Sequence, residues 1–94
     1  MKNKENNLVR ILRVLGDVNR LKIFCLLSQQ KNKVCVTTIA EKLDITVANA
    51  SYHLRILTKN SILEPERDGP TVCYVLKRTG PILDLKNYVC KYFK

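Results

Sequence analysis

The stretch from Thr38 to Leu57, TIAEKLDITVANASYHLRIL, contains two short helical patterns that are joined by a tight polar turn. The apolar residues of each half recur at the spacing of a helix that packs on one face. A hairpin pattern follows directly, because the dipeptide Asp68-Gly69 separates two short strand-like runs. A helix pair leading into a β-hairpin predicts a winged helix-turn-helix, an arrangement that lays one helix in the major groove of DNA.

The first helix of this pair has two possible starting points. Thr38 and Glu41 match a capping box, in which a hydroxyl and a carboxylate three residues apart close a helix N-terminus. Cys35, in the middle of a possible short strand at Val34–Val36, is the other candidate for the cap position. The helix is expected to end at the turn formed by residues 44–46.

The second helix of the pair is predicted to begin after Thr46, whose hydroxyl is a good N-cap, and to continue to about Lys59. Ala50, Leu54 and Leu57 share one face of this helix and are expected to point into the core. The opposite face is then available to a partner.

Further helices are predicted on both sides of this unit. Glu5–Leu15 carries apolar residues at helical spacing and is followed by Gly16, which favours a helix end. Asp17 is a suitable N-cap for a helix that reaches about Gln29. Pro81 suits the first turn of a last helix.

The hairpin completes the predicted fold. Its strands are expected at Ile62–Arg67 and Thr71–Leu76, and Pro65 indicates that the first of them lies at a sheet edge. We therefore expect a mainly α protein with a small β-hairpin. Residues 1–94 would form a single winged helix-turn-helix domain of five helices and a two-stranded wing.

Composition limits the possible classes of protein. A hydrophobic content of 46% excludes a disordered chain. The longest apolar run, Ile23 to Leu27, is too short to cross a membrane, and no apolar segment of signal-peptide type follows the N-terminus. We expect a cytoplasmic protein without membrane contact.

The net charge of +9 comes from 17 basic and 8 acidic residues and favours a polyanionic partner. Several of these cations lie in or beside the helix pair and hairpin. They are Lys31, Lys33, Lys42, Arg55, Lys59 and Arg67.

The first and last predicted helices are apolar over broad faces, which suggests that a second copy of the chain covers them. A two-fold homodimer would use both as dimerisation helices. The residues expected to be uncovered in one copy are Leu8, Ile11, Leu12, Leu15, Leu85, Tyr88, Val89 and Tyr92.

Three motifs carry a resemblance to a known family. They are residues 15–23 (LGDVNRLKI), 46–57 (TVANASYHLRIL) and 62–74 (ILEPERDGPTVCY). In this order they resemble the second helix, recognition helix and wing of the arsenic-repressor (ArsR/SmtB) family of winged-helix transcriptional repressors. The resemblance covers about residues 8–93 and implies a homodimer that binds a near-palindromic operator and leaves it when an inducer binds.

The resemblance and the helical periodicity select the same surface for double-stranded DNA. Small polar side chains on it can bond base edges, whereas the arginines suit phosphates. The expected DNA-binding residues are Thr46, Val47, Ala48, Asn49, Ser51, Tyr52, Arg55 and Arg67.

The metal sites of the family are incomplete in this sequence. Cys35-Val36-Thr37 keeps one thiol of the family's Cys-x-Cys motif, and the last helix offers Asp84 but no histidine. The single histidine, His53, borders the inward stripe of its helix and is expected to pack rather than to bind metal. We expect no metal or other cofactor, although a metalloid held by thiols alone stays an alternative.

Two of the four cysteines suggest a sensing function. In a cytosolic chain the default state of each cysteine is a reduced thiol, and Cys73 is expected to serve as packing in the hairpin. Cys25 and Cys90 are similar in position to the two cysteines of a thiol-sensing branch of the family. That resemblance implies an inducer that oxidises or persulfidates them.

Enzyme function has little support in the sequence. No Ser-His-Asp spacing, glycine-rich phosphate loop or paired carboxylates are present. The remaining alternative from another class is a winged helix that binds proteins, with its basic charge incidental.

Overall fold

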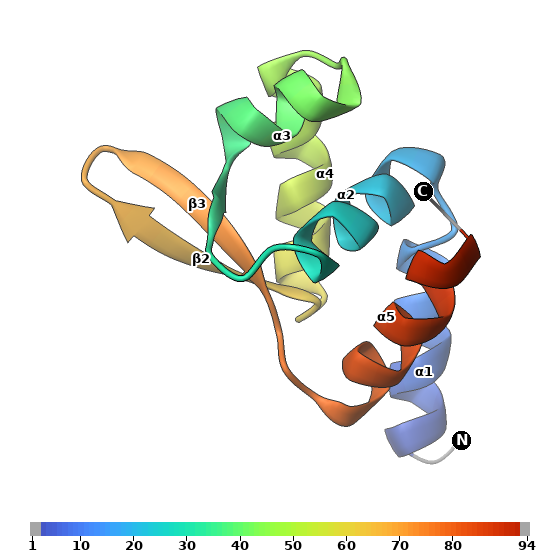
Figure 1. The fold of residues 1–94 in the computed structure, drawn as a ribbon. Coiled ribbons are helices and arrows are strands. Elements are labelled where there is room, and N and C mark those ends of the chain that lie inside the picture. The colour runs from blue at the N-terminus through green and yellow to red at the C-terminus, as the bar shows by residue number, and fades with distance from the viewer. Residues whose placement is uncertain (1–2, 93–94) are drawn as a thin grey trace.

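The computed structural model describes residues 3–92 (Figure 1). Among them are five helices and three strands, in the order expected of a winged helix. The elements are α1 (Asn3–Val14), α2 (Val18–Ser28), β1 (Val34–Cys35), α3 (Val36–Leu43), α4 (Val47–Lys59), β2 (Leu63–Asp68), β3 (Thr71–Leu76) and α5 (Gly80–Tyr92).

Two predicted N-caps define the starts of α2 and α4. The Asp17 carboxylate accepts hydrogen bonds from the backbone N–H groups of Asn19 and Arg20 at 2.9 and 3.1 Å. The Thr46 hydroxyl accepts one from the N–H of Asn49 at 3.0 Å. Both caps satisfy donors that have no partner within the helix, so the boundaries follow from local chemistry.

Helix α3 begins earlier than the capping box predicts. Its N-cap position is Cys35, and Val36 is already helical, so the start near Thr38 is wrong and the alternative at Cys35 is confirmed. The predicted strand is correspondingly one residue shorter, because the chain turns from β1 directly into α3. Asp44 ends α3 in the left-handed conformation with φ 56°, which aspartate tolerates better than most residues.

The sheet is antiparallel, with the strand order β1-β3-β2. The predicted wing hairpin is present as β2 and β3, and β1 adds a short third strand on its inner side. Pro65 lies on β2 at the sheet edge, as expected. Asp68 pairs with Thr71, and the turn between them uses Gly69 at φ 64°.

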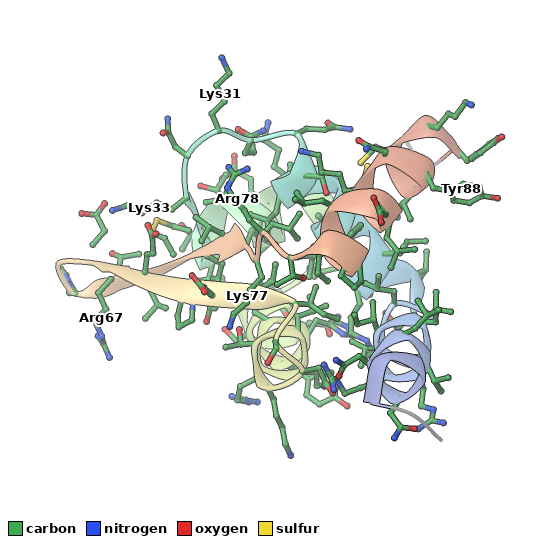
Figure 2. The ribbon with its side chains drawn as sticks, turned by 90° about the horizontal axis from the view of Figure 1, so that it is seen from below. Lys31, Lys33, Arg67, Lys77, Arg78 and Tyr88 are labelled. Carbon is green, nitrogen blue, oxygen red and sulfur yellow. A yellow bond between two sulfur atoms is a disulfide. The ribbon has the colours of Figure 1, made fainter. Side chains whose placement is uncertain are left out.

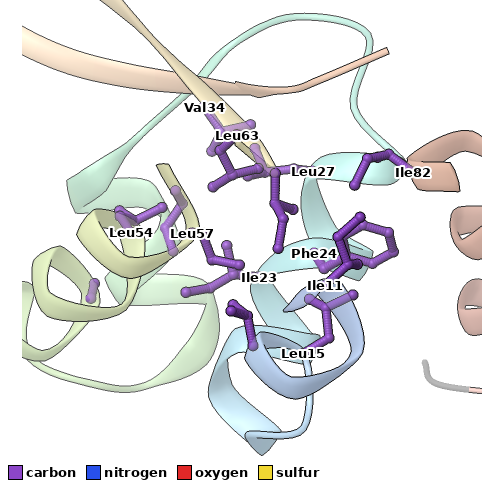
Figure 3. Close-up of a cluster of buried hydrophobic side chains, with 14 of the residues drawn as sticks. Ile11, Leu15, Ile23, Phe24, Leu27, Val34, Leu54, Leu57, Leu63 and Ile82 are labelled. Carbon is purple, nitrogen blue, oxygen red and sulfur yellow. The ribbon is translucent and has the colours of Figure 1, made fainter. Parts of the chain in front are cut away.

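Helix α2 is the centre of the core. It contacts α3, α4, α5 and β3, and the side chains of Ile23 and Phe24 are completely buried (Figure 3). Leu54 and Leu57 from α4 meet them from one side, and Ile82 from α5 approaches from another. Because α2 contacts both α5 and the helix-turn-helix, a movement of α2 relative to α5 would also change its position against α3 and α4.

No helix in residues 3–92 is long and apolar enough to cross a membrane.

Helices α1 and α5 lie at the end of the molecule opposite the wing (Figure 1). Leu8 and Leu12 on α1 are 45% and 50% exposed, and Tyr88 and Tyr92 on α5 are 66% and 70% exposed. The expected uncovered surface is smaller than the sequence indicated. Ile11 and Leu15 are buried in the protomer's own core, and Leu85 and Val89 are half-buried against it.

Candidate DNA interface and thiol pairs

The outer face of α4 presents most of the residues expected to contact DNA. Val47 and Tyr52 are about half exposed, and Ser51 is half-buried. Thr46 is exposed too, but its hydroxyl is engaged as the helix cap. The remaining exposed members are Ala48, Asn49 and Arg55.

The wing adds Arg67, which is exposed on β2. In Figure 2, Arg67 points to the side of the hairpin on which α4 lies. Lys31 and Lys33 lie on the other side of the hairpin in the same view. Positive charge is thus present on both sides of the hairpin, and Lys31 and Lys33 of the basic set identified in the sequence lie on the side away from α4.

A polar cluster anchors α4 to the start of α2. The Arg20 guanidinium donates to the carbonyl oxygen of Val14 at 2.6 Å, and its Nη1 lies 3.4 Å from Nδ1 of His53. The same His53 nitrogen is 3.9 Å from the Asp17 carboxylate. His53 is buried and packs edge-on against Tyr52, so the structural role expected for it fits its surroundings.

The N-cap geometry also sets the ionisation of Asp17. The backbone N–H of Arg20 is the main cause that lowers the pKa of this carboxyl, with the N–H of Asn19 and the nearby Arg20 and His53 charges assisting and partial burial opposing. The sequence identified Asp17 as a cap, but it did not show that Arg20 connects this cap to His53 on α4.

Cys25 and Cys90 lie next to each other, although 65 residues separate them in the sequence. The Cys25 thiol donates toward the Cys90 sulfur, and the two Sγ atoms are 3.3 Å apart. This distance is longer than a disulfide bond of about 2.05 Å, so the pair is in the thiol form. The side-chain amide of Gln29 also donates to the Cys25 sulfur, at 3.4 Å.

The two thiols of this pair have different surroundings. Cys25 is buried, and Cys90 is half-buried near the C-terminal end of α5. Burial, reinforced by the hydrogen bond and charge of Cys90, raises the pKa of Cys25 to about 11. At neutral pH Cys25 is therefore a thiol, which is a weak nucleophile until a partner or a base activates it.

Cys35 and Cys73 form a disulfide between β1 and β3. The expectations that all four cysteines are thiols and that Cys73 serves only as packing are wrong for this pair. The two residues are direct cross-strand partners, and their Cα atoms are 3.8 Å apart. Only the pairing of β1 with β3 brings them together, and no local pattern predicts the register of two strands so far apart along the chain.

Metal ligands do not assemble in the part of the chain that the structure describes. Within residues 3–92, no group of three or more His, Cys, Asp or Glu side chains is placed to hold an ion. Asp84 is exposed on α5, and His53 is engaged with α2.

With this geometry established, comparison with known proteins gives the family. Residues 17–64, about half of the chain, match the family model described as "Bacterial regulatory protein, arsR family". The chain belongs to the ArsR family. The match extends from the Asp17 cap through the helix-turn-helix to the first residues of β2, and this family of DNA-binding transcriptional regulators is not a class of enzymes.

Curated relatives in the family include cadmium-resistance regulators. The protein is 38% identical over 65 residues to the cadmium resistance transcriptional regulatory protein CadC of Listeria innocua serovar 6a, covering 69% of this chain and 54% of the relative. It is 31% identical over 75 residues to a CadC homolog of Staphylococcus aureus, covering 80% and 61%. The chain thus spans little more than half the length of the curated relatives it matches.

Solved structures confirm the winged helix-turn-helix. HlyU from Vibrio cholerae matches with a TM-score of 0.86 at 22% identity, covering all of both chains. The transcriptional repressor BigR from Xylella fastidiosa matches with a TM-score of 0.80 at 22% identity, covering 96% of this chain and 86% of BigR. A homodimeric winged helix-turn-helix domain from Mycobacterium bovis gives 0.77 at 22% identity, covering 95% and 83%. At 22% sequence identity, these matches show that the chain shares the fold of the three solved structures.

Proposed function

We propose that this ArsR-family protein is a homodimeric repressor that binds a near-palindromic operator and is released when Cys25 and Cys90 become covalently linked. The observation that carries the sensing part is the 3.3 Å distance between the two sulfurs. The family match and the exposed face of α4 support the DNA-binding part.

The proposed DNA contacts divide into two kinds. Asn49 and Ser51 carry donors and acceptors that suit base edges, and Tyr52 can contact bases through its ring or hydroxyl. Arg55 and Arg67 are exposed cations and would hold phosphates, which fixes the register of the protein on the duplex. A net charge of +9 on each protomer makes this association salt-dependent.

The proposed dimer uses α1 and α5. Leu8, Leu12, Tyr88 and Tyr92 leave large apolar side chains exposed at one end of the protomer, and self-association would remove them from water. A two-fold axis at this end would present two copies of α4 to two half-sites of the operator.

The thiol chemistry can be written with a hydrogen polysulfide as oxidant. The more accessible Cys90, as thiolate, attacks a sulfur of HS–SH and expels hydrosulfide, which gives a persulfide. Cys25 loses its proton to solvent and attacks the Cys90 sulfur, which expels a second hydrosulfide. In total, two thiols and one HS–SH give one disulfide and two H₂S.

The bond would act through the two helices that it joins. Its formation shortens the separation of the sulfurs from 3.3 Å to about 2.05 Å and holds α5 against α2. Helix α2 contacts α3 and α4, whereas α5 carries part of the proposed dimer surface. The link therefore biases the position of the recognition helix relative to the two-fold axis, as a switch between two arrangements requires.

Binding to DNA from the protein's own promoter tests this function. The reduced protein should shift the fragment in competition with unrelated DNA, and treatment with sodium polysulfide should abolish the shift. Cys90→Ser protein should bind the promoter fragment as well as the unmodified protein does, and polysulfide should leave its shift unchanged. If the reduced protein binds promoter DNA no better than unrelated DNA, the proposed repressor function is contradicted, and the alternative of a winged helix that binds proteins is favoured.

A second candidate is a sensor for a soft metal or metalloid. Two observations favour it: the relatives named for cadmium resistance and the adjacent sulfurs of Cys25 and Cys90. Soft thiolate ligands select such ions. Addition of arsenite or cadmium to the reduced complex with promoter DNA would release the DNA in this case, and polysulfide would then have no effect of its own.

A further inference from the structure

A second pair of cysteines lies within the DNA-binding unit itself. Cys35 occupies the N-cap position of α3, and Cys73 lies in the middle of the wing strand β3. We propose that Cys35 and Cys73 form a reversible oxidation site for low-molecular-weight disulfides, and that its bonded form holds the wing for tight DNA binding. The inference rests on the proposed DNA-binding function but not on sensing by Cys25 and Cys90.

The covalent bond reinforces a weak attachment. Strand β1 has only two residues, and its ladder with β3 consists of the pairs Val34↔Tyr74 and Cys35↔Cys73. So short a ladder is easily opened, since few backbone hydrogen bonds hold it. The disulfide joins the two strands at the residue where β1 passes into α3.

The position of the bond encloses the DNA-reading elements. The two cysteines are 38 residues apart in sequence, and the segment between them contains α3, α4 and β2. Arg67 and the outer face of α4 are therefore both inside the covalent loop. Reduction opens this loop at the root of the wing and gives the hairpin more freedom relative to α3 and α4.

The two sulfurs differ in their access to an oxidant. Cys73 has no exposed surface, whereas Cys35 is half-buried. Starting from the reduced pair, the Cys35 thiolate attacks a disulfide RS–SR and expels RS⁻, which takes up a proton. Cys73 then loses its proton and attacks the Cys35 sulfur, expelling the second RS⁻. Two thiols and RS–SR thus give one protein disulfide and two RSH.

This site is separate from the pair on α2 and α5. The wing lies at the end of the molecule opposite α5 (Figure 1). Cys25 and Cys90 join helices that lead toward the proposed dimer surface, whereas Cys35 and Cys73 join the wing strand β3 to the start of α3, which packs on the proposed DNA-reading helix α4. The effects on DNA affinity are therefore expected to have opposite signs, because fixing a binding element in its bound arrangement lowers the entropy cost of binding.

The test uses full-length protein with both Cys25→Ser and Cys90→Ser, in which only the second pair can respond. Oxidised glutathione should form the Cys35–Cys73 bond, seen by mass as the loss of two hydrogens and by resistance to alkylation. Hydrogen exchange without DNA should show greater protection of β1 and β3 in the bonded form. The bonded form should bind promoter DNA roughly three- to tenfold more tightly than the dithiothreitol-reduced form.

The matched control carries Cys35→Ser and Cys73→Ser in addition to Cys25→Ser and Cys90→Ser, and its wing protection should be the same under both treatments. Three results would overturn the inference: no bond under glutathione, a bond that leaves β1 and β3 exchange unchanged, or a bond without tighter DNA binding. Failure of every variant and of the unmodified protein to bind DNA would overturn the proposed function and this inference with it. If one of the three results occurs but polysulfide still releases the unmodified protein from promoter DNA, this inference fails and the proposed function is retained.

Discussion

The Sγ atom of Cys25 lies 3.3 Å from the Sγ atom of Cys90, and this contact joins the central helix α2 to the C-terminal helix α5. The resemblance to a thiol-sensing branch suggested the pair, and the fold places its members side by side. Because α2 also packs on α3 and α4, chemistry at these sulfurs has a short physical route to the proposed DNA-binding surface.

The dimer is tested by Leu12→Glu. Leu12 is 50% exposed on α1, and a carboxylate there would be buried without a partner if α1 lies in the dimer interface. Sedimentation at micromolar concentration should give monomers for this variant and dimers for the unmodified protein. Thr37→Glu, an equal charge change at an exposed position on α3, should stay dimeric. A monomeric unmodified protein would refute the prediction.

Alanine substitutions test whether α4 reads the bases and Arg67 of the wing contacts a phosphate. Arg67→Ala should weaken binding to all sequences alike and lower the salt slope by about one, because one phosphate contact is lost. Ser51→Ala and Tyr52→Ala should instead change the order of preference among operator variants. Fluorescence anisotropy over a salt series and a set of sequences measures both effects. An unchanged preference for both helix variants would move base recognition away from α4.

Acid stability should depend on Asp17. Its pKa is lower in the folded protein than in the unfolded chain, so its contribution to stability is present above the unfolded value and is lost as the pH falls through the folded value. Asp17→Asn keeps a good N-cap but cannot ionise. Denaturant unfolding near neutral pH and near pH 3 should show a smaller loss of stability for this variant. An equal loss in both proteins would argue against the assigned pKa direction.

The Cys35–Cys73 bond should stabilise the fold. A bond that closes a segment of this length restricts the unfolded chain, and its removal is expected to lower the free energy of unfolding by about 2–4 kcal/mol. Urea unfolding of the Cys25→Ser/Cys90→Ser protein in its oxidised and its dithiothreitol-reduced form measures the difference. Equal midpoints and slopes would show that the bond contributes nothing to stability.

Local chemistry made much of the fold predictable. The caps at Asp17 and Thr46 and the Asp68-Gly69 turn are short-range signals, and the elements that they bound are confirmed. The start of α3 was ambiguous because two cap signals compete within a few residues, and the strand pairing at Cys35 decides between them.

Long-range features were harder to predict. The Cys35–Cys73 disulfide depends on the register of β1 with β3, which no local pattern encodes. Ile11 and Leu15 were expected at the dimer surface, but helical periodicity does not tell which apolar face is covered by the same chain. The family resemblance singled out Cys25 and Cys90, but only the packing of α5 on α2 shows that their sulfurs are adjacent.

The most direct test of the sensing mechanism measures bond formation and DNA release in the same samples. Reduced protein bound to promoter DNA is titrated with sodium polysulfide, and at each step the bound fraction is read by anisotropy and the Cys25–Cys90 link by mass. The bound fraction should fall in proportion to the linked fraction, and Cys25→Ser and Cys90→Ser complexes should stay intact. Full linkage of Cys25 to Cys90 with the DNA still bound would contradict the mechanism.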